Sequence, residues 1–108
     1  PLPGDPVDAT SIGAIFELLD LPEHGVGYEL QAYVEASDGW ITPLMIRPAG
    51  AEDFRASWNR VGGETSRVSE YVTADLTGLA AGEYVLWLRA TLPGSGGRAE
   101  TGRMLVVR

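Results

Sequence analysis

The sequence predicts an all-β protein, an antiparallel β-sandwich of about seven strands in two sheets. Three observations predict this fold class. Apolar and polar residues alternate with a period of two along seven short segments, and turn-forming residues separate the segments at the spacing typical of sandwiches and barrels. No segment shows a convincing helical period, although the apolar run "GAIFELLDL" is too short to be assigned by periodicity alone.

The chain has the length of one ordinary domain. Its 108 residues and apolar fraction of 44% are sufficient for a continuous core. Residues 1–11 hold three of the seven prolines and are expected to be a linker or an edge segment, because proline cannot donate to a ladder. The sandwich domain is expected to span residues 12–108, with neither a membrane helix nor a secretory leader.

The first two predicted strands, residues 12–21 and 26–36, each place apolar side chains on one face. The inward set expected in the first strand is Ile12, Ala14, Phe16 and Leu18. The inward set expected in the second strand, which has the clearest alternation in the chain, is Val26, Tyr28, Leu30, Ala32 and Val34.

Residues 40–47 and 53–60 are predicted as the two middle strands. Pro43 lies inside the first of them, which indicates an edge strand or a bulge. The inward residues expected in 40–47 are Trp40, Thr42, Leu44 and Ile46. Those expected in 53–60 are Phe54, Ala56 and Trp58.

Residues 67–76, 83–92 and 103–108 complete the prediction, with "PGSGG" as a hairpin loop before the last strand. The inward sets are Val68, Val72, Ala74 and Leu76, then Tyr84, Leu86, Leu88 and Ala90. Glu70 also falls on the inward side, which predicts a slip or a bulge in its strand rather than a catalytic carboxylate. If Met104 and Val106 point inward, Leu105 and Val107 point outward.

Composition and charge exclude several functional classes. The net charge is −7, and all eight basic residues are scattered Arg residues, so a nucleic-acid surface or an anionic membrane surface is not expected. The absence of Cys excludes disulfides, thiolate zinc sites and cysteine nucleophiles. The absence of Lys, with abundant Ala, Gly and Arg, suggests a GC-rich bacterial source.

A corner between two strands is predicted at residues 76–84. Tyr84 begins an apolar strand, and its hydroxyl is expected to bond to the backbone a few residues upstream. Leu76 and Leu79 would pack beneath the corner, while Gly78 and Gly82 would relieve backbone strain.

The segment Leu76, Leu79, Gly82 and Tyr84 resembles the corner of fibronectin type III domains, which are immunoglobulin-like sandwiches. "GYELQAYVEASDGW" is similar to that family's third strand and the turn after it. The chain departs from the family at Phe16 or Leu18, where a core Trp is common, and in the longer middle segment "DFRASWNR". The resemblance implies a non-catalytic module of a larger surface or secreted protein, outside the cytoplasm.

No catalytic or cofactor constellation stands out, so neither an enzyme nor a cofactor site is expected. His24 is the only His and lies in a turn, which favours a solvated loop residue. Acidic pairs for glycoside hydrolysis arise easily by chance among 15 acids. The segment "GSGG" lacks the Lys of a phosphate loop, and the acidic turns lack the spacing of a calcium loop.

The aromatic residues suggest a binding surface instead. Trp40 and Trp58 are predicted in the core, whereas Tyr33 and Trp87 are predicted outward on neighbouring strands. With the other outward apolar residues they form a predicted partner-binding face of Tyr33, Val85, Trp87, Leu105 and Val107. Its partner is a neighbouring domain, another protein or a second copy. The alternatives are coverage by the Pro-rich N-terminal segment, or carbohydrate binding on the same aromatics.

Overall fold

The computed structural model describes residues 6–7, 12–22, 25–94 and 96–108, with side chains described from Glu17 onward. These residues contain nine strands. Their bounds are β1 Pro6–Val7, β2 Ile12–Asp20, β3 Tyr28–Ala36, β4 Ile41–Leu44, β5 Ile46–Pro48, β6 Trp58–Arg60, β7 Arg67–Asp75, β8 Gly82–Thr91 and β9 Arg98–Val107. The described part of the chain contains no helix long and apolar enough to cross a membrane.

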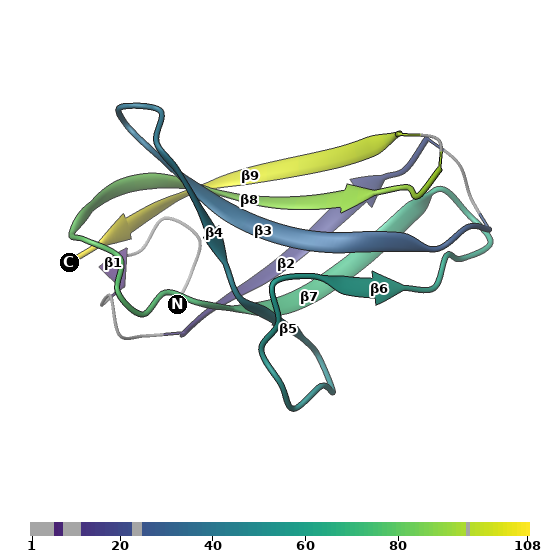
Figure 1. Ribbon diagram of the computed structural model, residues 1–108, viewed down its shortest axis with the longest axis horizontal. Helices are drawn as coiled ribbons and strands as arrows, with labels where there is room; N and C mark the ends of the chain where they lie inside the picture. Colours follow the sequence, from purple (N-terminus) through teal and green to yellow (C-terminus); the bar gives the residue numbers. More distant parts are fainter. Residues whose placement is uncertain (1–5, 8–11, 23–24, 95) are drawn as a thin grey trace.

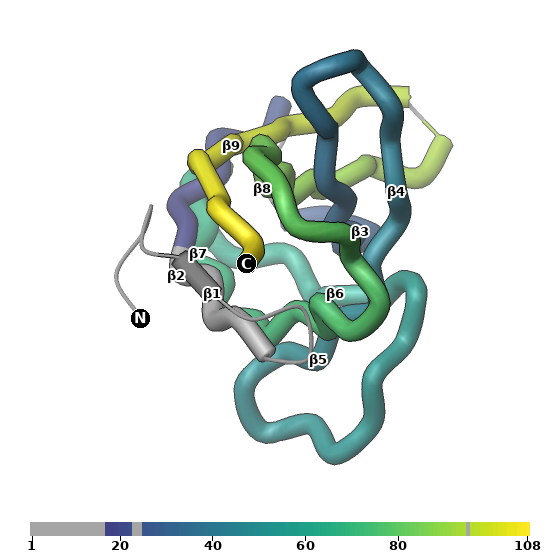
Figure 2. Tube along the Cα trace, turned by 90° about the vertical axis from the view of Figure 1, so that its left-hand side faces the viewer, coloured from purple at the N-terminus to yellow at the C-terminus, as the bar shows by residue number. Residues whose placement is uncertain are grey.

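The strands form two sheets that enclose the core (Figures 1 and 2). The larger sheet has the order β1-β9-β8-β3-β4, with β6 also paired to β3, and the smaller sheet has the order β2-β7-β5. All pairs are antiparallel except β1 with β9, which is parallel. The predicted fold class is therefore confirmed at the level of a β-sandwich-like all-β protein with two sheets.

The N-terminal segment contributes to the larger sheet at one place. Pro6 and Val7 form β1 and pair with Val106 and Val107 at the end of β9. A strand this short at a sheet edge accommodates proline, because the outer side of an edge strand has no partner that requires its N–H. The rest of residues 1–11 lies outside the described part of the chain.

The predicted strand 40–47 is two strands in two different sheets. β4 pairs with β3 in the larger sheet, whereas β5 pairs with β7 in the smaller one, so the chain crosses between sheets at Met45. Pro43 lies in β4 at the sheet edge, as predicted. Only Trp58–Arg60 of the predicted strand 53–60 is a strand, and the loop before it extends away from both sheets (Figures 1 and 2).

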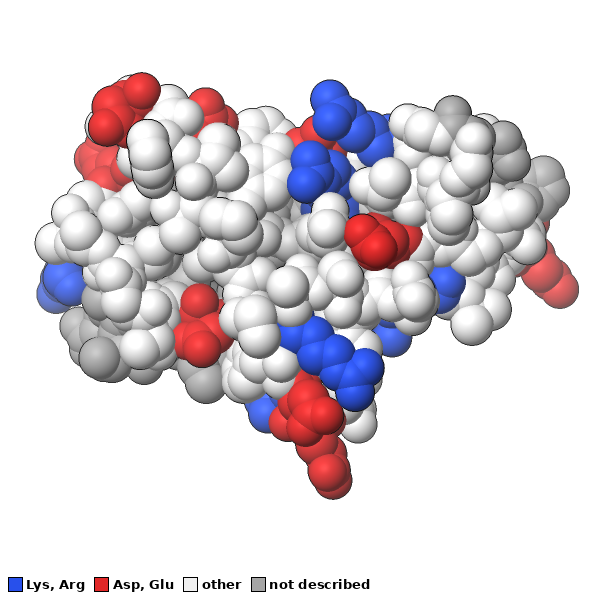
Figure 3. All heavy atoms as spheres, viewed as in Figure 1, with Lys and Arg blue, Asp and Glu red and all other residues white. Residues whose placement is uncertain are grey.

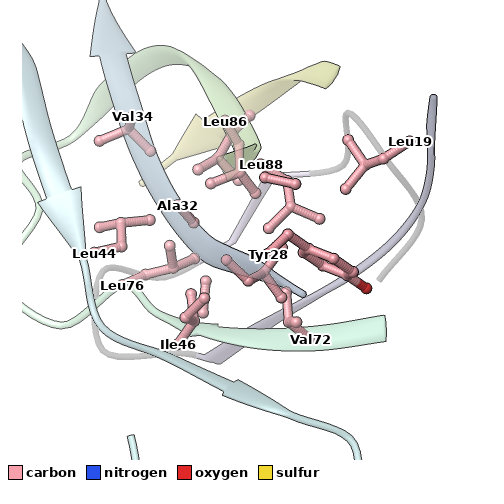
Figure 4. Close-up of a cluster of buried hydrophobic side chains, with 14 of the residues drawn as sticks. Leu19, Tyr28, Ala32, Val34, Leu44, Ile46, Val72, Leu76, Leu86 and Leu88 are labelled. Carbon is pink, nitrogen blue, oxygen red and sulfur yellow. The ribbon is translucent and has the colours of Figure 1, made fainter. Parts of the chain in front are cut away.

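Both sheets contribute to the hydrophobic core (Figure 4). It contains most of the inward residues predicted for β3, β7 and β8, while Val68 and Tyr84 are partly buried and pack against it. Val26 is the exception in its set: it precedes the start of β3 at Tyr28, and it is exposed.

The inward prediction for β2 is wrong at Leu18, which is 55% exposed, while Glu17 and Leu19 are buried. The side chains of Ile12, Ala14 and Phe16 lie outside the described set. Among the described side chains of this segment, Leu19 and Leu21 belong to the core.

The predicted corner is confirmed. Tyr84 donates its hydroxyl proton to the backbone carbonyl oxygen of Ala80, 2.6 Å away. Leu76 is fully buried beside it, and Leu79 packs against the core. Gly78 has a φ of 89°, a left-handed conformation that glycine adopts without the steric cost of a Cβ atom. The corner therefore links β7 in one sheet to β8 in the other.

Substituting Phe for Tyr84 should lower the free energy of unfolding by about 1 kcal/mol, the typical net value of one hydrogen bond. The ring would keep its packing, so the dependence of this free energy on denaturant concentration should not change. Urea unfolding of both proteins measures the difference. An unchanged midpoint would show that the hydroxyl contributes nothing to the corner.

Candidate docking face

The strand register determines which side chains share the outer face of the larger sheet, because directly opposite residues of an antiparallel pair point to the same side. We call this surface the outer face. Its central residues lie in three rows across β9, β8 and β3, and the first two rows continue onto β4. The rows are Met104, Val85, Glu35 and Ile41, then Gly102, Trp87, Tyr33 and Pro43, then Glu100, Arg89 and Gln31.

An aromatic pair lies at the centre of the outer face. Tyr33 and Trp87 are direct cross-strand partners, with ring centroids 6.3 Å apart and planes inclined by 21°. The indole of Trp87 covers Gly102, where an added Cβ would lie 2.9 Å from two ring carbons. Gly102 thus leaves room for the indole to lie close against β9.

Polar neighbours hold both rings in place. Trp87 donates its indole N–H to Glu35 Oε1, 3.1 Å away, and Tyr33 donates its hydroxyl proton to Glu100. Desolvation, followed by the hydrogen bond to Glu100, raises the pKa of Tyr33 above its ordinary value. The guanidinium of Arg89 lies 5.2 Å from the centroid of the Tyr33 ring, within the range of a cation–π contact. The rings are therefore preorganised on the sheet.

Three of the five predicted face residues are brought together as expected: Tyr33, Val85 and Trp87 all lie on the outer face and are half-buried. The outward placement of Leu105 and Val107 is wrong, because both are buried in the core. The hairpin register opposes Leu105 to the inward Tyr84 and Met104 to the outward Val85, which reverses the assumed alternation of β9.

Two exposed apolar residues on the outer face were not predicted. Met104 is 57% exposed beside Val85, and Ile41 is exposed at the β4 edge. The sequence contains a usable signal for Met104. Pairing β9 with β8 residue by residue from the "PGSGG" loop aligns it with Val85, which the alternation of β8 already places outward.

Of the other two tryptophans predicted in the core, Trp40 lies outside it and Trp58 packs at its edge. Trp40 is 73% exposed in the turn between β3 and β4, so the prediction of a core residue is wrong there. Trp58 packs against the core while half-buried, and donates its indole N–H to the carbonyl oxygen of Ile46, 2.7 Å away. Only Trp87 therefore contributes an indole to the outer face.

A hollow of about 360 Å³ adjoins Tyr33 at one side of the outer face. It forms where β4 ends and β6 has not yet begun, because the chain leaves the larger sheet between these strands. Its lining residues are Gln31, Ala32, Tyr33, Ile41, Pro43, Ala56 and Arg89. The hollow thus combines an aromatic and apolar wall with one cation and one amide.

A second cluster of charged residues lies inside the sandwich, away from the outer face. Glu17 and Glu70 are cross-strand partners on β2 and β7, and both side chains are buried. Arg103 pairs with Glu17, to which Thr101 also donates a hydrogen bond of 3.1 Å. The predicted slip at Glu70 is wrong, since the β2–β7 ladder is continuous from Ile12 opposite Asp75 to Asp20 opposite Arg67.

Glu70 is only 3% exposed and has two charge-stabilising partners. Arg60 approaches it with two nitrogens, Nε at 3.1 Å from Oε2 and a terminal nitrogen at 3.2 Å from Oε1, and Tyr28 donates its hydroxyl proton to Oε2. Such a paired and hydrogen-bonded carboxylate can remain charged in a buried position. This arrangement favours a structural role for Glu70.

Stability should fall as the pH rises above about 10. Desolvation, then the hydrogen bond to Glu70, raises the pKa of Tyr28, so the folded state retains a proton that the unfolded state loses. The protonated Tyr28 hydroxyl therefore makes its full contribution to stability below the pKa that Tyr28 has in the unfolded chain. This contribution is lost as the pH rises through the higher pKa that Tyr28 has in the folded protein. Unfolding measured between about pH 9 and pH 11 tests this, and the Tyr28→Phe variant should show a shallower decline. An equal decline in both proteins would exclude Tyr28 as a source.

The packing of Trp87 on Gly102 can be tested by one substitution on the outer face. In Gly102→Ala the new methyl group would overlap the Trp87 ring and displace the indole from β9. Because side chains move while the backbone stays, we expect the indole fluorescence to shift and the free energy of unfolding to fall by about 1 kcal/mol, the low end for overpacking. Fluorescence spectra and urea unfolding of the variant measure both. A spectrum identical to that of the wild type would contradict the close packing of Trp87 on Gly102.

Charged groups are dispersed over the side of the molecule shown in Figure 3, where Arg groups often adjoin Asp or Glu groups. Within the described part of the chain, no three His, Cys, Asp or Glu side chains gather as a metal site would require. His24 lies outside the described residues.

Comparison with models of known protein families, with curated protein sequences and with solved structures finds no match for this chain.

Proposed function

We propose that this chain is a non-catalytic accessory module that docks a neighbouring domain or a protein partner through its outer face. The observation that supports this most is the continuity of apolar side chains across four neighbouring strands. Met104, Val85, Trp87, Tyr33 and Ile41 lie on the same side of β9, β8, β3 and β4. Apolar and aromatic side chains gathered on one surface are typical of partner contacts.

We also propose that the module is of the fibronectin type III or immunoglobulin-like type. In immunoglobulin domains strands B, E and D form one sheet, and strands C, F and G form the other. The sheet β2-β7-β5 has the chain positions of the first group, and β3, β8 and β9 have those of the second. The hydrogen bond from Tyr84 to Ala80 has the place of that fold's tyrosine corner.

The wider context of the proposal follows from this type of module and, for the bacterial source, from the Lys-free composition rich in Ala, Gly and Arg. It would belong to a larger bacterial protein exposed outside the cytoplasm, with no nucleic-acid partner.

The non-catalytic part of the proposal is supported by the buried acids. Glu17 and Glu70 each have an Arg partner, which favours a structural role for these acids over a catalytic one.

Selection from a displayed library of random octapeptides tests the docking proposal and requires no named partner. We expect peptides to be enriched on the wild-type chain and to lose binding to Trp87→Ser. The matched variant Leu18→Ser, which removes an exposed apolar residue from the smaller sheet, should retain binding. Because Trp87 lies outside the core, both variants should fold. Peptides that bind Trp87→Ser as well as the wild type, or no enrichment, would contradict the proposal.

Carbohydrate binding is the second candidate, and the near-parallel rings of Tyr33 and Trp87 beside the hollow, with the polar groups of Gln31 and Arg89 in its wall, favour it. A sugar ring can stack on such rings while Gln31 and Arg89 bond to its hydroxyl groups. This candidate predicts saturable quenching of indole fluorescence by an oligosaccharide in the wild type and none in Trp87→Ser. The docking proposal predicts no quenching by oligosaccharides in either protein.

A further inference from the structure

Arg89 differs from most arginines of this acidic chain in having no ion pair described, and from Arg47 in having a buried nitrogen without an acceptor. Arg55, Arg60, Arg67, Arg98 and Arg103 each lie within ion-pair distance of a carboxylate. Arg89 is half-buried, and the partners described for it are the amide of Gln31, 3.2 Å from a terminal nitrogen, and the ring of Tyr33. Its Nε atom is buried and has no hydrogen-bond acceptor within the described part of the chain.

The acid directly opposite Arg89 on the outer face is already engaged. Glu100 is the cross-strand partner of Arg89, but its carboxylate accepts a hydrogen bond from Tyr33 and lies 3.4 Å from Arg98 Nε. A partly buried guanidinium without a carboxylate has lost hydration that no ion pair replaces. Arg89 also lines the hollow, so an anion entering there would meet a guanidinium for which no ion pair is described.

The remaining walls of the hollow are apolar. Ile41, Pro43, Ala56 and the Tyr33 ring surround a volume that accommodates a side chain rather than a folded element. Tyr33 belongs both to the hollow and to the aromatic pair. A partner segment that crosses the outer face over Trp87 and Tyr33 would therefore continue directly into the hollow.

We infer that the hollow is the anchor site for an Asp or Glu side chain of an extended peptide segment, which pairs with Arg89 while a neighbouring apolar residue packs on Tyr33, Ile41 and Pro43. This inference rests on the proposed docking function and specifies the partner's chemistry. The net charge of −7 repels acidic segments at long range, so the attraction is local. Added salt should screen that repulsion and leave the partly buried pair largely intact.

The octapeptide selection, extended to Arg89→Gln, tests the inference. We expect peptides with an acidic residue beside an apolar one to be enriched on the wild type. Their affinity should fall about tenfold or more for Arg89→Gln, as for loss of a charge-assisted hydrogen bond. Arg47→Gln is the matched control, because Arg47 contacts the ring of Phe54 in another part of the chain. A synthetic copy of an enriched peptide with Gln in place of the acid should show the same loss.

Each outcome has a distinct meaning. Enrichment of peptides without an acidic residue, or of peptides that bind Arg89→Gln as tightly as the wild type, would overturn the inference, while dependence on Trp87 would still support docking. No enrichment would overturn both. Competition by sodium acetate or glucuronate at concentrations equal to those of the peptide would show a site for free carboxylates or acidic sugars, which also contradicts a peptide anchor.

Discussion

Replacing Arg60 by leucine is expected to lower the free energy of unfolding by about 2–3 kcal/mol, because it leaves the buried carboxylate of Glu70 without its ion-pair partner. The value lies below the usual cost of breaking a buried pair because the Arg60 side chain is itself 35% exposed and partly screened. Urea unfolding at neutral pH measures the loss.

Two further variants distinguish the loss of the Arg60–Glu70 ion pair from a general effect of removing an arginine. Arg67→Leu breaks an exposed ion pair with Asp20 and should cost less than about 0.5 kcal/mol. The double variant Arg60→Leu/Glu70→Leu should recover much of the stability, because no charge then remains buried without a partner. Equal losses in Arg60→Leu and Arg67→Leu would show that burial of Glu70 is not what makes Arg60 important.

Gly62→Ala is expected to destabilise the protein by about 3 kcal/mol or more, the upper range for overpacking. A Cβ atom at Gly62 would lie 1.8 Å from the carbonyl oxygen of Val26 and 2.5 Å from its carbonyl carbon. These are backbone atoms, so relief requires the loops before β3 and before β7 to separate.

The adjacent glycine is a matched control for this effect. A Cβ atom at Gly63 would meet nothing within 4 Å, so Gly63→Ala should change stability by less than about 1 kcal/mol. Thermal unfolding of the two variants compares the sites directly. Similar melting temperatures would contradict the close approach of the two loops at Gly62.

Alternation predicts the fold where one face is buried and the other is solvated. It places Tyr28, Leu30, Ala32 and Val34 in the core correctly, because each polar residue between them lies on the outer side of β3. It is insufficient for Leu105, because Met104 and Val106 are apolar as well and both parities are plausible. The hairpin pairing with β8 supplies the missing constraint.

Glu17 and Glu70 show a second limit of sequence patterns. An acid on an apolar strand face indicates a shifted register, since an unpaired buried charge is costly. Here the compensating cations come from other strands: Arg103 on β9 lies far along the chain from Glu17, and Arg60 lies on β6, the strand that precedes β7. No local pattern predicts such a pairing, whereas the corner at Tyr84 is predictable because its bond spans four residues.

The candidate site is also predictable only in part, because a local sequence pattern does not show which strands come together. Trp87 and Tyr33 follow from the parity of their own strands, and their contact follows from placing those strands side by side. The hollow results from the departure of the chain at Met45 and its return before Trp58, a crossing that the continuous run "WITPLMIR" conceals.

The most direct test of the docking surface uses the three tryptophans as reporters in one spectrum. Their indole N–H groups report on the outer face at Trp87, on the edge of the core at Trp58 and on the β3–β4 turn at Trp40. A ¹⁵N-labelled chain titrated with an enriched octapeptide should show a saturable shift of the Trp87 signal and an unchanged Trp58 signal. A bound peptide that leaves the Trp87 signal unmoved would show that the outer face is not the docking surface.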